Sequence, residues 1–173
     1  MIDMKKFALI LALLMLIPCL SGCGEKLLPQ ERPADFSFSL VWGAYGTSSY
    51  NSRTGKLVKT TDATHPEDYV TYLKLSEEML EFIYQDLRKL DVDSYPDEYD
   101  PDPRMGSDPS ADLILTVRTG DYVKTITAKD VSLSYQSWLP KGKKFLDTCL
   151  GISDFLMSTE EWKALPDYEF YYD

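Results

Sequence analysis

The chain contains two stretches in which apolar residues recur every three or four positions, as they do on one face of an α-helix. The first stretch follows Ser76, and its apolar residues are Met79, Leu80, Ile83, Leu87 and Leu90. The second runs from Lys143 to Met157, and its apolar residues are Phe145, Leu146, Cys149, Ile152, Phe155 and Leu156. Ser76 is a favourable N-cap, and Glu77 and Glu78 stand where the helix dipole favours negative charge. We therefore predict two amphipathic helices, the first of which ends near Leu90.

Shorter segments alternate apolar and polar residues with the period of two that is typical of a β-strand. This pattern predicts strands at residues 36–42, 56–60, 69–75, 112–117 and 122–128. Ser52-Arg53-Thr54-Gly55 and Thr119-Gly120-Asp121 are turn sequences, and they predict two hairpins. Gly43, Gly46 and the Thr and Ser residues that follow them predict a bulge or bend.

The order of these elements predicts the fold class. Three strands, a helix, two strands and a second helix follow one another, and hairpins dominate. We expect an α+β domain with an antiparallel sheet of about five strands in β-β-β-α-β-β-α order, with the helices packed on one face. Ser158-Thr159-Glu160-Glu161 fits a capping box and predicts a last short helical turn that carries Trp162. A single globular domain is predicted for residues 35–173.

The start of the chain follows a different pattern. Lys5 and Lys6 form a positively charged beginning, and no polar residue occurs from Phe7 to Ile17. This apolar run is shorter than the about 20 residues that a membrane-spanning helix needs. It fits the apolar core of a cleavable signal peptide. Pro18 then stops the helix, because proline lacks an N–H and clashes with the preceding turn.

Leu20-Ser21-Gly22-Cys23 follows at the right distance, and it resembles the lipobox of bacterial lipoproteins. The resemblance implies cleavage between Gly22 and Cys23 and a diacylglyceryl thioether on the Cys23 sulfur. It predicts a signal peptide at residues 1–22, a membrane tether at 23–34 and a location on the extracytoplasmic face of the cell membrane. Fully extended, residues 24–34 would reach about 36–40 Å. An ordinary signal peptide with a chance cysteine is the alternative.

Charge limits the classes of partner. The whole chain has a net charge of −10, and residues 1–22 carry two Lys and one Asp, so the chain from Cys23 onward has a net charge of −11. So acidic a surface argues against nucleic acid and against electrostatic docking on anionic lipid. We therefore expect the lipid anchor to hold the protein at the membrane.

Cysteine usage excludes an internal disulfide. After cleavage only Cys23 and Cys149 remain, and lipid attachment consumes Cys23. Stability must therefore come from the hydrophobic core. Cys149 lies in the apolar stripe of the second helix, and we interpret it as a buried small hydrophobic residue rather than a reactive thiol.

Candidate catalytic chemistry is sparse, and the catalytic residues are unknown. His65 is the only histidine, and no G-x-S-x-G nucleophile motif accompanies it. The sequence has no Cys/His cluster for zinc and no Gly-rich phosphate loop before a helix. No cofactor and no metal are therefore expected. Glu77 and Glu78 or another carboxylate pair could serve a hydrolase, but a chain with 28 acidic residues contains such pairs by chance.

The segment from Asp91 to Asp112 is the most acidic part of the chain. It holds eight acidic residues and the prolines Pro96, Pro101, Pro103 and Pro109. We predict an exposed, mobile loop, because proline and like-charge repulsion oppose regular structure. Tyr95 and Tyr99 are then candidate contacts for a partner. Calcium bound by the clustered carboxylates is the alternative interpretation.

Aromatic residues are frequent, with 12 Tyr and 3 Trp. Tyr45, Tyr50 and Trp138, like the two tyrosines of the acidic segment, fall in predicted loops or strand ends, where ligands usually meet proteins. We therefore expect a non-enzymatic binding or interaction module of the cell envelope, with a protein, peptide or glycan as its partner. A small envelope hydrolase that uses paired carboxylates is the alternative, and a structural or assembly role is the third hypothesis.

Overall fold

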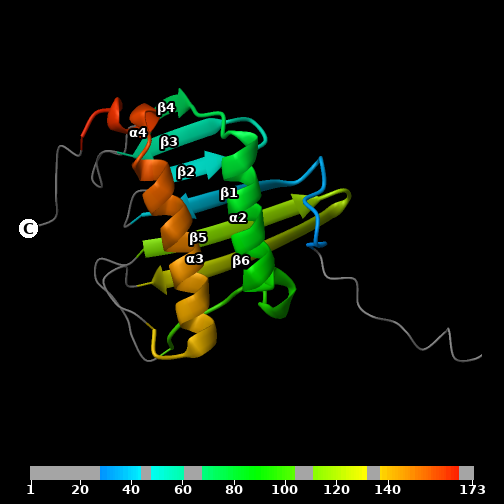
Figure 1. The fold of residues 1–173 in the computed structure, drawn as a ribbon. Helices are drawn as coiled ribbons and strands as arrows, with labels where there is room; N and C mark the ends of the chain where they lie inside the picture. The colour runs from blue at the N-terminus through cyan, green and yellow to red at the C-terminus, as the bar shows by residue number, and fades with distance from the viewer. Residues whose placement is uncertain (1–27, 44–47, 61–67, 104–110, 132–136, 168–173) are drawn as a thin grey trace, which may run out of the picture.

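The protein folds as a two-layer α+β domain. The computed structural model describes residues 28–43, 48–60, 68–103, 111–131 and 137–167. Within these ranges a six-stranded antiparallel sheet has the order β4-β3-β2-β1-β5-β6, and the two long helices lie across one of its faces (Figure 1). The predicted fold class is thereby confirmed at the level of an α+β domain with an antiparallel sheet.

The sheet has one strand more than predicted. Its strands are β1 (Ser37–Trp42), β2 (Ser48–Asn51), β3 (Lys56–Thr60), β4 (Asp68–Tyr72), β5 (Ala111–Thr119) and β6 (Tyr122–Val131). The prediction of about five strands missed β2, whose four residues include only one large apolar side chain. β2 forms nevertheless because it pairs with β1 on one side and with β3 on the other. The element order therefore begins with four strands, and not with three.

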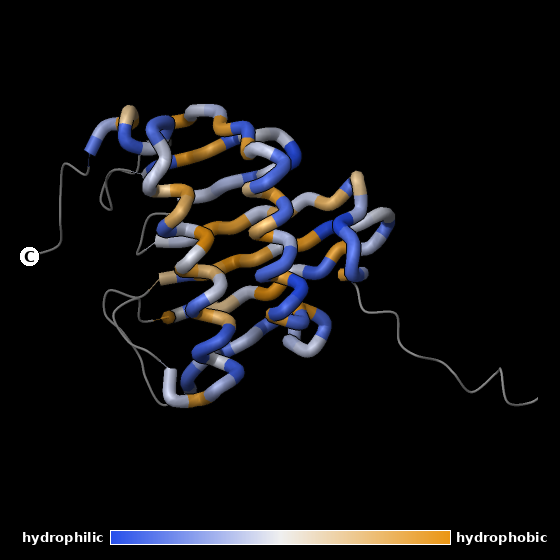
Figure 2. The backbone as a smooth tube through the Cα atoms, viewed as in Figure 1, coloured by the Kyte–Doolittle hydropathy of each residue, from blue (hydrophilic) through white to orange (hydrophobic). Residues whose placement is uncertain are grey.

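The strand register gathers the large apolar side chains on the helix-covered face. Leu40 pairs with Leu115, which in turn pairs with Ile126, and each of the three is at most 1% exposed. Figure 2 shows these central strands as the most hydrophobic part of the sheet. The β5–β6 hairpin turns through Gly120 at φ 55°, a left-handed conformation that glycine adopts without strain. The predicted second hairpin is thereby confirmed.

The helices run in opposite directions across the sheet (Figure 1). α2 covers Glu77–Leu90, and Ser76 caps it as predicted, with its hydroxyl accepting the Met79 amide at 3.2 Å. α3 covers Pro140–Met157 and begins three residues before the predicted start. α4 is the short turn Glu160–Lys163, and its cap is Thr159 rather than Ser158. Its Trp162 packs on Trp42, with the ring centroids 5.6 Å apart.

The acidic segment is more ordered than predicted over residues 91–103. Val92–Ser94 forms the 3₁₀ helix η2, and Glu98 forms a parallel bridge with Thr127 of β6. The Thr127 amide donates to the Asp97 carbonyl at 2.7 Å, and the Tyr99 amide donates to the Thr127 carbonyl at 2.9 Å. The apolar side chains between the acids explain the difference, since Val92 and Tyr95 are buried. Residues 104–110 of the predicted loop lie outside the described residues.

Candidate functional site

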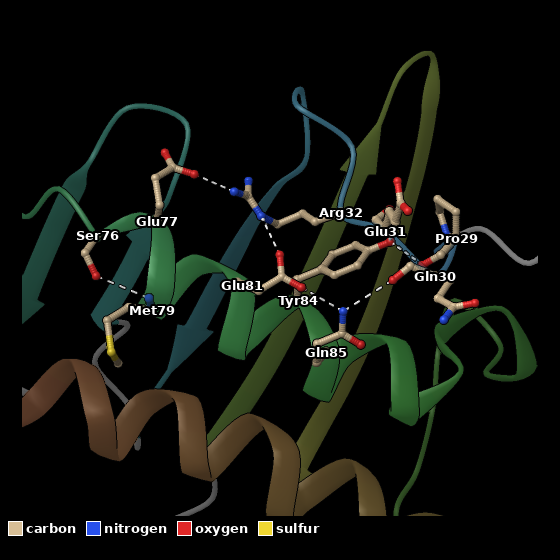
Figure 3. Close-up of polar contacts among 10 residues, drawn as sticks. All are labelled: Pro29, Gln30, Glu31, Arg32, Ser76, Glu77, Met79, Glu81, Tyr84 and Gln85. Carbon is tan, nitrogen blue, oxygen red and sulfur yellow. Dashed lines mark hydrogen bonds and ion pairs between the residues drawn. The ribbon is translucent and has the colours of Figure 1, made fainter.

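Residues 28–34 lie against α2 and are not a free tether. Leu28 is only 4% exposed and belongs to the hydrophobic core. Polar contacts join the same segment to one face of α2 (Figure 3). We call residues 28–34 together with this face of α2 the N-terminal clasp. The prediction that the tether extends to residue 34 is wrong for 28–34, and residues 23–27 lie outside the described part of the chain.

Tyr84 is the centre of the clasp. Its hydroxyl lies 2.6 Å from the Pro29 carbonyl oxygen and 3.2 Å from that of Glu31. A carbonyl oxygen only accepts, so the Tyr84 proton is directed to these two atoms. Burial raises the pKa of Tyr84 above its usual value, which keeps this donor protonated. The ring meets Phe36 edge-on, with the centroids 4.8 Å apart.

Arg32 and Gln85 add polar contacts on either side of Tyr84. The Arg32 guanidinium pairs with Glu77, and its Nε donates to Glu81 at 3.1 Å. Gln85 donates to the Gln30 carbonyl at 3.4 Å and to Glu81 at 2.8 Å. Because the Glu77 side chain is 86% exposed, solvent screens that ion pair, and we expect it to contribute only about 0–1 kcal/mol. The buried Leu28 and Tyr84 therefore carry most of the stability of the clasp.

The clasp also fixes the direction in which the chain leaves the domain. Arg32 contacts the first turns of α2, whereas Pro29 and Gln30 contact Tyr84 and Gln85, two turns later. The segment, followed toward the N-terminus, thus runs toward the C-terminal end of α2 (Figure 3). Only residues 24–27 separate it from Cys23, and the five extended residue steps from Leu28 to Cys23 reach about 17 Å. This reach is less than half of that expected for a tether ending at residue 34.

The sequence contains one signal for the clasp, which no periodic pattern reveals. Leu27 and Leu28 are two adjacent apolar residues in an otherwise polar and Pro-containing stretch. They carry no periodicity, and the described residues 28–34 form neither a helix nor a strand. Apolar residues without periodicity in such a stretch are typical of a tether, which is why the pattern does not predict the clasp.

The structure places the predicted site residues in different environments. Gly22, Cys23, Tyr45 and His65 lie outside the described residues. Tyr50, expected near a strand end, is 1% exposed, and its hydroxyl donates to the Leu73 carbonyl at 3.0 Å.

Tyr95 and Tyr99 belong to an aromatic cluster with Phe145 of α3. The two tyrosine rings meet edge-on with their centroids 4.9 Å apart, and both contact the Phe145 ring. Tyr95 is 2% exposed, and its hydroxyl donates to the Lys141 carbonyl at 3.1 Å. Burial raises the pKa of Tyr95 to about 12. The prediction that Tyr95 is an exposed anchor is wrong; a partner contact through this segment stays a prediction.

The candidate ionisable groups lie in ion pairs or in the core. Glu77 is engaged with Arg32, and Asp97 pairs with Lys124 at 2.5 Å. In the described ranges no group of three or more His, Cys, Asp or Glu side chains gathers to hold a metal ion. Cys149 is fully buried, as predicted, and burial raises the pKa of its thiol far above the usual range. This environment suits a packing residue and not a nucleophile.

Trp138 has the exposure expected of a binding residue. Trp138 is 78% exposed, and Leu139 beside it is 39% exposed. Both precede α3, whose first turns contain Lys141, Lys143 and Lys144. Exposed aromatic and apolar side chains next to cationic ones form a surface unlike the acidic remainder of the chain.

Comparisons with known proteins leave the chain without an assigned family. No protein-family profile matches it, and no curated protein shows significant sequence similarity to it. Among the residues that the structure describes, no helix combines the length and the apolar character needed to cross a bilayer.

Proposed function

We propose that this protein is a lipid-anchored lipoprotein of the extracytoplasmic membrane face whose α+β domain acts as a binding module of the cell envelope. The observation that carries the proposal is Leu20-Ser21-Gly22-Cys23 immediately after the apolar run of the signal sequence. The small residues before Cys23 let an extended backbone enter a peptidase, and the thiol accepts the lipid. Two acyl chains hold a protein on a bilayer where a single chain is marginal.

The clasp supports a role close to the membrane. It leaves four residues, 24–27, between the lipid-bearing Cys23 and the folded domain, so the domain stays within about 17 Å of the anchor. A domain that binds ligands far from the membrane would need a longer tether to reach them. The short one suits a domain that meets its partner at the membrane surface.

The exposed side chains support binding as the activity. Tyr72 at the end of β4 and Phe82 on α2 are 69% and 62% exposed, and Trp138 is more exposed still. Large side chains with an apolar body are common at the centres of interfaces. We expect a protein, peptide or glycan of the envelope as the partner.

Lipid attachment is tested by labelling cells that produce the full chain with a fatty acid. The wild type should be labelled and lose residues 1–22, whereas Cys23→Ala should lose both the label and the cleavage. Cys19→Ala and Cys149→Ala are matched controls that remove the other two thiols and should leave the labelling unchanged. Equal labelling of Cys23→Ala, or loss of label in Cys19→Ala, would contradict the assignment of the lipid to Cys23.

The clasp is tested by thermolysin, which cleaves before exposed leucines. Leu28 must leave the core before the bond preceding it can be cut. Tyr84→Phe removes the hydroxyl that binds Pro29 and Glu31, which should raise the cleavage rate at this bond about fivefold, for the loss of about 1 kcal/mol.

Tyr50→Phe is the matched control for the clasp, because it removes another buried tyrosine hydroxyl that binds Leu73 instead. It should lower the free energy of unfolding to a similar extent and leave cleavage before Leu28 at the wild-type rate under native conditions. Equal cleavage of both variants would show that residues 28–34 open only when the whole domain unfolds.

A further inference from the structure

The start of α3 presents a patch whose character differs from that of the rest of the domain. We define the basic patch as Trp138, Leu139, Lys141, Lys143 and Lys144 with Lys89 of α2. The two helices are joined here, because the Lys144 ammonium of α3 donates to the Lys89 carbonyl of α2 at 2.5 Å. Lys89, Lys143 and Lys144 line an open groove between the C-terminal end of α2 and the beginning of α3. In a domain with an excess of acids, such a cluster is a local reversal of charge.

The charges of the basic patch are only partly neutralised. Lys89 pairs with Asp86 at 3.0 Å, and Lys143 pairs with Asp147 at 2.5 Å. Lys141 and Lys144 instead donate to the backbone carbonyl oxygens of Ser94 and Lys89, which carry no full charge. Lys141 also lies over the Tyr95 ring, 4.5 Å from its centroid. Both ammonium groups are exposed and can meet anions outside the protein.

Contacts of its neighbours Ser137 and Gly142 hold Trp138 in its exposed position. The Ser137 hydroxyl donates to the Pro101 carbonyl at 2.8 Å and accepts the Leu139 amide at 3.1 Å. The Gly142 backbone packs so closely on Pro101 that a Cβ there would lie 2.0 Å from the carbonyl oxygen. Trp138 therefore projects from a segment fixed at both ends.

The clasp brings the lipid anchor to the same end of the domain. Gln30 contacts Gln85, and Lys89 stands one helical turn, about 6 Å, farther along α2. Residues 28–34, followed toward the N-terminus, run toward that end, and the five residue steps from Leu28 to Cys23 reach about 17 Å when extended. The lipid on Cys23 can thus enter a membrane that faces the C-terminal end of α2 and the N-terminal end of α3.

We propose that the basic patch rests on the membrane that holds the lipid anchor, with Trp138 and Leu139 at the headgroup level and the lysines on anionic headgroups. Tryptophan is enriched at membrane–water interfaces, and clusters of lysine bind anionic lipid surfaces. Salt screens charges beyond a Debye length of about 8–10 Å, so distant acids oppose this contact little. The acids of residues 91–103 lie closer, because this segment contacts Lys141 and Ser137, and the lysines must attract anionic lipid in spite of them. This inference rests on the proposed function, since the anchor keeps the patch close to the bilayer.

The contact would orient the domain. The anchor alone is a single attachment and fixes no orientation, whereas the anchor and the basic patch together give two attachments to one surface. The end of the domain that carries α2's N-terminus and α4 would then point away from the membrane (Figure 1).

The test uses tryptophan fluorescence, because Trp42 and Trp162 are 4% and 7% exposed and Trp138 is the exposed one of the three. The mature, lipidated protein is purified from bacteria that process the full chain and is reconstituted in vesicles. Neutral phosphatidylcholine vesicles are compared with vesicles that also contain phosphatidylglycerol. We expect acrylamide quenching of Trp138 to fall at least threefold on the anionic vesicles, and Trp138→Phe should remove this change.

Two double variants separate the patch from net charge. Lys141→Glu with Lys144→Glu should restore quenching to the level on neutral vesicles. Lys56→Glu with Lys74→Glu changes the net charge equally at two exposed lysines near the opposite edge of the sheet, and it should behave as the wild type. Circular dichroism checks that each variant is folded. Equal protection of Trp138 in both double variants would overturn the role of the basic patch.

Mass spectrometry of Cys23 distinguishes the two proposals. A chain without lipid on Cys23 refutes the proposed function, and the membrane contact falls with it. A lipidated chain whose Trp138 stays equally open to acrylamide on both kinds of vesicle refutes the membrane contact alone. If a purified anionic wall polymer protects Trp138 and phosphatidylglycerol does not, the partner of the basic patch is the polymer and the membrane proposal is wrong.

Discussion

The two long helices begin in opposite ways. At α2, the Ser76 hydroxyl caps the first turn, Glu77 and Glu78 follow, and basic residues occupy the last turn. At α3, the N-cap position is Leu139, which offers no side-chain acceptor, and the first turn contains no acid but a lysine. The helix dipole favours the first arrangement and opposes the second.

The difference shows where each helix obtains its stability. α2 has local support at both ends, so its sequence alone specifies the start. α3 depends on distant residues: Gly142 packs on Pro101, and Tyr95 donates to the Lys141 carbonyl. A helix start that departs from local rules and is held by tertiary contacts is common at functional sites. This departure agrees with a basic patch that is retained for a role other than folding.

The largest expected effect comes from glycine to alanine substitutions in α3. Gly142→Ala would place a Cβ 2.0 Å from the Pro101 carbonyl oxygen, so we expect a loss of about 3 kcal/mol or more in the free energy of unfolding. Gly151→Ala is the matched control, because no heavy atom lies within 4 Å of its Cβ. It should stabilise the domain by about 0.5–1 kcal/mol, since alanine is the better helix former. Urea denaturation measures both, and changes of the same sign would mean that Pro101 does not support α3.

A smaller effect is expected at the capped helix. Ser76→Ala removes the acceptor of the Met79 amide and should cost about 1 kcal/mol of unfolding free energy. Ser76→Asp restores an acceptor and should recover most of that loss. An unchanged urea midpoint in Ser76→Ala would mean that α2 is stabilised by packing alone. The start of α2 would then depend on tertiary contacts, as the start of α3 does.

The smallest effect is a gain at the uncapped helix. Leu139 has φ −80° and ψ 121°, the extended conformation of an N-cap residue, so Leu139→Ser can supply the missing acceptor. We expect a gain of about 0.5 kcal/mol, measured as a rise in melting temperature, and Leu139→Ala should show no such gain. A loss in both variants would show that Leu139 contributes to packing in spite of its exposure.

Sequence patterns predicted the parts of the fold whose support is local. The stripe of α2 and the cap at Ser76 lie within a few residues of each other, and the positive φ of the hairpin turn requires only the glycine at position 120. One contact of this turn is distant, since the Gly120 amide donates to the Asp35 carboxylate at 2.7 Å. β2 could not be predicted in this way, because it forms from pairing with strands on both sides. The order in residues 91–103 likewise depends on Thr127 and Phe145, which come much later in the chain.

The candidate site follows the same division. The lipid site at Cys23 is predicted from its immediate neighbours, because the lipobox resemblance covers only four consecutive residues. The clasp joins residues that are 45–55 positions apart, and no local pattern records such a contact. Trp138 was noted as a loop residue, but its support by Ser137 and Pro101 is visible only in three dimensions.

The sequence separation across the clasp has a consequence for the order of events after synthesis. Under the proposed export, Cys23 and Leu28 reach the outer side of the membrane first, and their binding face on α2 emerges about fifty residues later. Contacts between distant parts of a chain form late, because the intervening loop must close. Under the same proposal, signal cleavage and lipid transfer would act before residues 28–34 dock on α2, and their docking afterwards would draw the finished domain toward the bilayer.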